Sequence, residues 1–238
     1  MSAIYLIRHG QAGPRHRYDE LSELGRAQAA SLGCHLAAPG TVFTALYAGG
    51  LHRQQQTAEI VRDALAEANE SVPEIVIDDG WNEFNLSSVY RALAEHLSRD
   101  LPGFAEDLAE MQAALIADPN TVRGAAGRCD RLVIEAWMEH RYPHEEIPSW
   151  SEFRTRVEAQ RDLFSRHEGE RIAIFTSATP IAITVGAALG LTNEKILGLM
   201  GALYNTSVSE LRLRDGELWL LSFNSSAHLN DPAMRTFR

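Results

Sequence analysis

Ala3-Ile4-Tyr5-Leu6-Ile7 runs directly into Arg8-His9-Gly10, and this stretch decides the fold. An apolar run that ends at a glycine turn is typical of a strand buried in a parallel sheet. Ligands of open α/β sheets bind outside the carboxyl ends of such strands, so we expect His9 in a crevice. An imidazole there can attack phosphorus with one nitrogen while a backbone carbonyl holds the other, and Arg8 can bind phosphate oxygens. The alternative is a surface pair or a structural histidine.

Composition narrows the class of protein. The chain has 238 residues, 45% hydrophobic and 23% charged, which suits one large domain with an insertion. A formal net charge of −10 at pH 7 argues against nucleic-acid binding. Cys34 and Cys129 cannot build a disulfide framework, and no signal-peptide pattern is present, so we expect the cytoplasm. The apolar residues 178–191 are too few to span a bilayer, so no membrane role is predicted.

Strands and helices alternate along most of the chain. Strands are predicted over residues 3–7, 42–48, 75–77 and 172–176, and a terminal hairpin over 208–213 and 218–223. Between them lie helices, one capped by Ser22 and another begun by a Ser149/Glu152 capping box. Residues 85–146 show helical periodicity only. The pattern predicts a single three-layer α/β domain over 1–238, with a mostly parallel sheet, helices on both faces and a helical insertion (cap) at 85–146.

Several ordered segments resemble one family. They are residues 6–11, 24–29, 51–58, 205–208 and 224–229. Together they resemble the nucleophile motif, the following helix, the second arginine segment and the C-terminal strands of the histidine phosphatase superfamily, the phosphoglycerate mutase-like group. The resemblance implies a phosphohistidine at His9, a small phosphorylated substrate and inorganic phosphate as ligands, and no metal or cofactor.

The resemblance also implies a set of site residues. His9 and Glu83 would be catalytic, and the phosphate would be bound by Arg8, Gln11, Arg53, Ser177 and Ala178. Arg53 would stand just inside a helix that follows a strand, where its guanidinium and the helix N–H groups face the crevice of His9. Without the family match, Arg53 would be read as a solvated helix residue.

Glu83 stands where the family places its proton donor. Flanked by Trp81 and Phe84, its carboxyl could be desolvated, stay protonated and donate to the leaving alkoxide, then act as base toward water. The alternatives are a solvent-facing glutamate at a helix start, or Asp78 or Asp79 as the acid.

Ser177 departs from the family pattern, which usually has a second histidine at this position, after the strand at 172–176. A serine donates one neutral hydrogen bond and brings no positive charge. The loss of one transition-state donor costs about 100- to 1000-fold in rate, so turnover can survive. The turn also opens a helix, whose N–H groups, including that of Ala178, can hold an anion.

These residues favour hydrolysis of a small phosphomonoester. A mutase is less favoured because the loop after Gln11 is short and lacks the mutases' asparagine-bearing pattern. The rival from another class is a weak or inactive phospho-ligand-binding or regulatory protein.

His140 and His144 have the spacing of a metal pair, but Pro143 interrupts the helix, so a solvated loop is predicted. Arginines of the insertion are predicted to be solvated, or else to meet distal anionic groups; substrate and oligomeric state are not predicted.

Overall fold

A computed structural model describes residues 2–14, 17–69, 71–118, 121, 123–142 and 144–237. The chain forms two compact units. The first consists of Met1–Glu83 with Arg156–Arg238, and the second of Phe84–Thr155. The second unit contains the residues that the sequence predicts as an insertion.

A six-stranded mixed sheet organises the first unit, in the order β3-β2-β4-β1-β5-β6. Its strands are β1 (Ser2–Arg8), β2 (Ala45–Ala48), β3 (Ile75–Ile77), β4 (Arg171–Thr176), β5 (Val208–Arg214) and β6 (Glu217–Ser225). β1 to β4 pair in parallel, while β5 pairs antiparallel with both β1 and β6. The predicted fold class is therefore confirmed, and both antiparallel pairings involve β5 of the terminal hairpin.

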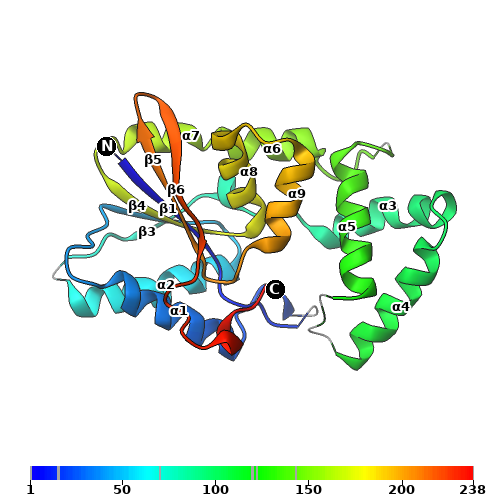
Figure 1. Ribbon diagram of the computed structural model, residues 1–238, viewed down its shortest axis with the longest axis horizontal. Coiled ribbons are helices and arrows are strands. Elements are labelled where there is room, and N and C mark those ends of the chain that lie inside the picture. The colour runs from blue at the N-terminus through cyan, green and yellow to red at the C-terminus, as the bar shows by residue number, and fades with distance from the viewer. Residues whose placement is uncertain are drawn as a thin grey trace. The chain divides into compact units, whose positions relative to one another are not determined.

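Helices cover both faces of this sheet (Figure 1). One face carries α1 (Glu23–Leu36) and α2 (His52–Ala68), and the other α7 (Arg161–Arg166), α8 (Ala178–Leu189) and α9 (Asn193–Ala202). Each face buries its own apolar core. Ile7 and Phe175 face α1 and α2, whereas Ile4 and Ile174 lie in the core with α8. This alternation along β1 and β4 follows from the two-residue period of a strand.

One predicted boundary is wrong. The strand predicted from residue 42 begins at Ala45, because Val42 is exposed and the pairing with β4 starts only at Ala45 and Ile172. The helix that follows Ser177 ends at Leu189, because Gly190 takes a left-handed conformation with φ 65°. The Ser22 cap is confirmed: its Oγ accepts a hydrogen bond from the N–H of Gly25.

The regular secondary structure of the second unit is helical within its described residues. It holds α3 (Leu86–Asp100), α4 (Phe104–Ala117), α5 (Ala125–Met138) and the first part of α6 (Trp150–Glu158). An aromatic cluster joins α5, α6 and the segment before α3; it is formed by Phe84, Trp137, Trp150 and Phe153. The Ser149/Glu152 capping box is confirmed, since each residue's side chain accepts from the other's backbone N–H.

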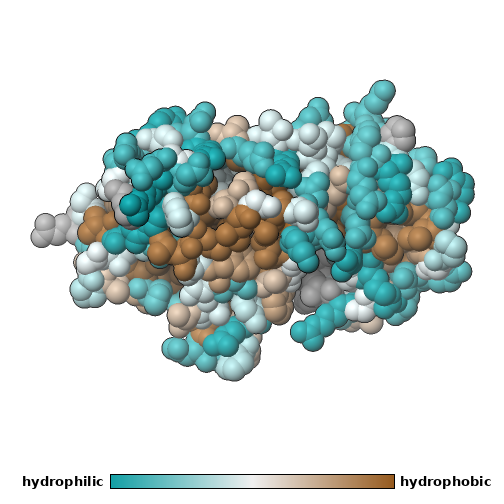
Figure 2. Space-filling model, turned by 45° about the horizontal axis from the view of Figure 1, so that its top comes forward, coloured by the Kyte–Doolittle hydropathy of each residue, from teal (hydrophilic) through white to brown (hydrophobic). Residues whose placement is uncertain are grey.

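The surface mixes hydrophobic and hydrophilic side chains, as one face shows (Figure 2). Among the exposed apolar residues are Trp219 and Leu221 on β6 and Val76 and Ile77 on β3, the two edge strands. Within the described part of the chain, no helix is both long enough and apolar enough to cross a membrane.

Candidate functional site

The predicted site residues follow the carboxyl ends of the parallel strands. Arg8 and His9 lie at the end of β1, and Ser177 comes directly after β4. Arg53 is in the first turn of α2, which follows β2. Glu83 follows β3 and the short 3₁₀ helix η2 (Asp79–Trp81). Because these strands are parallel, the residues that follow them gather at one edge of the sheet.

His9 is held rigidly by its backbone. Its N–H donates to the carbonyl of Thr176 at 2.8 Å, and its own carbonyl accepts from Asn205 Nδ2 at 3.1 Å and from the N–H of Thr206 at 3.2 Å. Gly10 cannot carry a side chain, since a Cβ there would lie 2.5 Å from the Gly25 carbonyl oxygen. These backbone contacts on both sides of His9 fix the position from which its imidazole extends.

The ring hydrogen bonds of His9 fix its tautomer. Nδ1 lies 2.7 Å from the carbonyl oxygen of Gly10, which can only accept, so Nδ1 carries the proton. Nε2 then has a free electron pair, and it accepts from Nε of Arg53 at 3.2 Å. His9 is 2% exposed. Nε2 is thus the ring nitrogen whose electron pair is available to an electrophile.

Electrostatics keep this imidazole neutral. Burial lowers the pKa of His9 well below its ordinary value, and the positive charges of Arg53 and Arg8 lower it further. The hydrogen bond with Gly10 acts in the opposite direction but is the smallest contribution. A neutral imidazole can attack an electrophile at neutral pH, which an imidazolium cannot.

Arg53 is buried and already engages an anion. Its Nη1 lies 2.9 Å from the Oδ1 of Asp19, a half-exposed side chain. Its guanidinium carbon lies 4.8 Å above the centre of the Tyr18 ring, within cation–π distance. The guanidinium therefore contacts both Nε2 of His9 and the carboxylate of Asp19.

Both terminal nitrogens of Arg8 bind backbone carbonyls, whereas the sequence predicts that they bind phosphate oxygens. Nη1 donates to the carbonyl of Leu203 and Nη2 to that of Phe237, at 2.7 Å for the second. Nε is buried and has no hydrogen-bond partner among the described residues. Burial lowers the pKa of Arg8, while Tyr18 and Glu83 partly counter this. A buried N–H donor left unpaired costs free energy, so an anionic oxygen at Nε would be stabilising.

The side chain of Glu83 contacts the N-terminus of α8. Its Oε2 accepts a hydrogen bond from the backbone N–H of Thr179 at 3.1 Å, and a helix N-terminus favours negative charge. The two flanking rings also make contacts of their own, since Trp81 stacks on Phe164 and Phe84 contacts Trp137.

The alternative acids, Asp78 and Asp79, are engaged locally. Oδ1 of Asp78 accepts from the N–H of Gly80 at 2.8 Å, and Oδ1 of Asp79 accepts from Asn82 Nδ2 at 2.9 Å. Both carboxylates thus shape the turn that leads to Glu83.

Ser177 is buried at the start of α8, and its Oγ accepts from Nε2 of Gln54 at 2.9 Å. Sequence reasoning missed Gln54; the available signal was a polar side chain next to Arg53 on the first turn of a helix. Ala178 is half-buried and packs against the core. Gln11 is tied to the start of α1, because its Oε1 accepts from Oγ of Ser22, the N-cap of that helix, at 2.7 Å.

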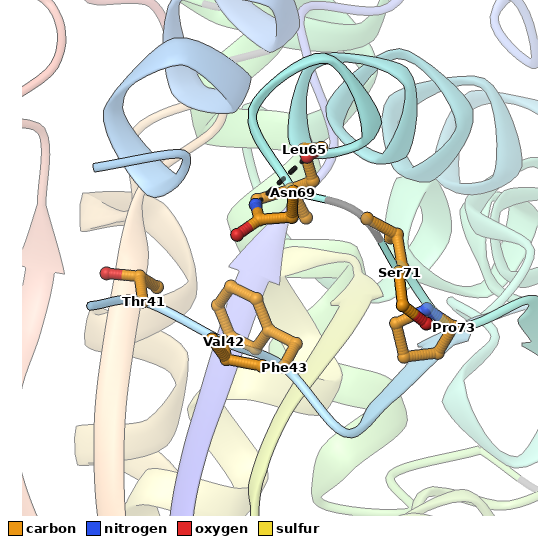
Figure 3. A pocket seen from close by; sticks show the side chains of 8 residues that line it. Thr41, Val42, Phe43, Leu65, Asn69, Ser71 and Pro73 are labelled. Carbon is orange, nitrogen blue, oxygen red and sulfur yellow. Dashed lines mark hydrogen bonds between the residues drawn. The ribbon is translucent and has the colours of Figure 1, made fainter. Parts of the chain in front are cut away.

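Other candidate sites carry less chemistry. The rings of His140 and His144 lie 5.5 Å apart, and Pro143 is outside the described residues. No group of three or more potential metal ligands occurs among the residues described. A pocket near the start of β2 and β3 has no titratable lining group (Figure 3). Its lining consists of Thr41, Val42, Phe43, Leu65, Asn69, Ser71, Val72 and Pro73.

Known proteins resemble the chain in sequence pattern and fold. The family model described as histidine phosphatase superfamily (branch 1) matches residues 4–142 and 104–226. Bacillus stearothermophilus YhfR is 20% identical with a TM-score of 0.63, and the match covers 97% of this chain and 100% of that one. A phosphoglycerate mutase from Bacillus anthracis is 16% identical with a TM-score of 0.62, covering 96% and 95%. A mycobacterial glucosyl-3-phosphoglycerate phosphatase complexed with VO3 is 18% identical, with a TM-score of 0.63 and coverage of 94% and 99%. No curated protein matches significantly.

Proposed function

Because the chain belongs to the histidine phosphatase superfamily, we propose that it hydrolyses a small phosphomonoester through a phosphohistidine at His9. One observation carries this proposal. Nε2 of His9 is unprotonated, because the ring proton is on Nδ1, and it accepts a hydrogen bond from Nε of Arg53. Arg8 immediately precedes His9, and its unpaired Nε would supply a second donor to the bound phosphoryl group.

The proposed reaction has two steps. In the first, Nε2 of His9 forms a bond to phosphorus while the bond from phosphorus to the ester oxygen breaks, and Glu83 in its acid form gives that oxygen a proton. In the second, water attacks phosphorus, the P–N bond breaks, and Glu83 takes a proton from the water. Arg8 and Arg53 stabilise charge on the phosphoryl oxygens in both steps.

The ligands follow from this chemistry. The substrate is a small phosphorylated molecule, and inorganic phosphate is the second product. The structural relatives include a phosphoserine phosphatase complexed with phosphoserine and the mycobacterial phosphatase complexed with VO3. These support the phosphomonoesterase class without naming the substrate of this chain. The cytoplasmic location stays a prediction.

A second function, binding of a phosphorylated ligand without efficient turnover, is favoured by Ser177. A buried serine that accepts a hydrogen bond from a neutral amide stands where the family pattern has a cationic side chain. Mutase-type phosphoryl transfer would use the same nucleophile, and the fold likeness to a mutase does not favour it over hydrolysis.

Turnover of a chromogenic phosphomonoester by wild type and His9→Ala separates these functions. The matched control is His52→Ala, a substitution of an exposed histidine that begins α2. We expect turnover and an acid-labile phosphoprotein with wild type and the control, and neither with His9→Ala. Equal, near-zero turnover in all three proteins, together with phosphate binding measured by calorimetry, would instead establish the binder.

A further inference from the structure

Gln54 joins three separate turns with one side chain. Its Nε2 donates to Oγ of Ser177 at 2.9 Å and to the carbonyl of Trp81 at 3.2 Å, and its Oε1 accepts from the N–H of Leu51 at 3.3 Å. The side chain is fully buried. It thereby links the segments that follow β2, β3 and β4, which are the segments that carry Arg53, Glu83 and Ser177.

The surrounding backbone is shaped to admit this amide. A Cβ on Gly49 would lie 2.1 Å from Oε1 of Gln54, so any side chain there would displace it. The carbonyl of Trp81 has a second partner, because Oγ1 of Thr176 also donates to it at 2.6 Å. Loss of the Gln54 amide would therefore leave the Trp81 carbonyl with one hydrogen bond from Thr176, but it would remove the donor to Oγ of Ser177.

The direction of this hydrogen bond determines what Ser177 can do. A carboxamide nitrogen can only donate, so Oγ of Ser177 uses an acceptor position toward Gln54. The serine keeps its hydroxyl proton for another acceptor. Arg8 is paired with Thr176 in the parallel ladder, so the residues that follow them, His9 and Ser177, leave adjacent strands together.

We propose that Gln54 is a positioning residue, which orients Ser177 so that the serine hydroxyl donates to a phosphoryl oxygen held beside His9. The inference rests on the proposed function, since it assigns a donor within that same site. In this arrangement Ser177 acts as a neutral oxyanion donor, and Gln54 sets the direction of its proton without touching the substrate.

A double-mutant cycle tests this role, using Gln54→Met, Ser177→Ala and the pair combined. Met keeps the length of Gln54 but cannot donate a hydrogen bond. We expect each single substitution to lower kcat about 10- to 100-fold, with a smaller change in KM, and the pair to lose no more than the worse single variant. Losses in kcat that multiply in the double variant, or an unchanged kcat in Gln54→Met, would overturn the proposal.

A neighbouring glutamine provides the control. Gln55 is half-buried on the same helical turn and its Nε2 donates to the carbonyl of Gly50 at 2.8 Å, away from Ser177. Gln55→Met should keep wild-type kcat. Thermal unfolding of every variant checks that folding is intact. If Gln54→Met fails to fold, Gln54→Glu replaces it, because a carboxylate would draw the Ser177 proton to itself and again mimic Ser177→Ala.

Phosphate binding separates this inference from the proposed function. If wild type and His9→Ala are equally inactive, the hydrolytic proposal fails, and the cycle is repeated with the Kd of inorganic phosphate as the readout. Equal, non-additive weakening in Gln54→Met and Ser177→Ala supports the positioning role in a binding protein. An unchanged Kd in Gln54→Met, or no phosphate binding by wild type, overturns it.

Discussion

Nε of Arg53 donates to Nε2 of His9 at 3.2 Å, so one arginine atom covers the atom proposed to attack phosphorus. The contact has two effects in the free protein. It fixes the direction of the His9 electron pair, and its charge helps to lower the pKa of the imidazole. In the proposed reaction, the same guanidinium releases Nε2 when a phosphoryl group binds and moves its donors onto the phosphoryl oxygens.

Substitution of Arg53 should therefore change both rate and titration. Arg53→Gln removes the charge, so the pKa of His9 rises from its lowered value, and kcat falls about 100-fold through lost stabilisation of phosphoryl charge. NMR titration of the His9 imidazole measures the first effect and steady-state kinetics the second. Arg53→Lys, which keeps the charge but not the planar fork, should lose rate with less change in pKa. A His9 pKa that stays the same in Arg53→Gln contradicts this account.

We expect Asp19 to compete with an incoming anion for Arg53. Because Oδ1 of Asp19 lies 2.9 Å from Nη1 of Arg53, Asp19→Asn removes a negative charge from the position a phosphoryl oxygen would approach. Because the Asp19 side chain is half-exposed, solvent screens its charge and limits the change. We expect KM to fall about 2- to 5-fold at low salt and less at high salt. Glu20→Gln, on the same loop but paired with Arg17, should leave KM unchanged. A rise in KM for Asp19→Asn would show that the carboxylate helps substrate binding.

Introducing a histidine at position 177 should succeed only if Gln54 is shortened. Ser177 is 1% exposed and touches the fully buried Gln54, so Ser177→His alone overfills the space and costs about 1–3 kcal/mol of unfolding free energy. Gln54→Ala with Ser177→His should recover stability and raise the affinity for phosphate. Thermal unfolding and calorimetry give both quantities. Equal stability of Ser177→His with and without Gln54→Ala would show that the amide does not fill this space.

The sequence places residues at strand ends better than it predicts their partners. The apolar run before Arg8 places His9 at a strand end, and the resemblance of residues 51–58 to the family's second arginine segment predicts that Arg53 meets it, as the contact between the two side chains shows. The contacts of Arg8 with Phe237 and of Gln54 with Ser177 join residues 229 and 123 positions apart. Periodicity describes one element at a time, so it cannot show which buried polar groups satisfy each other across elements.

His228 predicts how stability depends on pH. Its pKa is lowered to about 4 by burial and by nearby His35, while an unfolded histidine titrates near 6.5. Between those values the unfolded chain binds more protons at this residue, so the contribution of His228 to stability is fully present above about pH 6.5 and is lost as the pH falls toward 4. His228→Gln should make the urea midpoint less dependent on pH in this window. His35→Gln, at an exposed position, is the control and should change the slope less.

The role of Glu83 as acid can be tested through the leaving group. Glu83→Gln keeps an oxygen that can accept from the N–H of Thr179, but it cannot supply a proton. An alkoxide needs that proton, whereas p-nitrophenolate leaves without one, so kcat should fall about 100- to 1000-fold for alkyl phosphates and much less for p-nitrophenyl phosphate. Asp79→Asn, which changes an exposed carboxylate in the same turn, should affect both substrates equally and weakly. If Asp79→Asn instead shows the leaving-group dependence, then Asp79 is the acid and the hydrogen bond from Thr179 gives Glu83 a structural role.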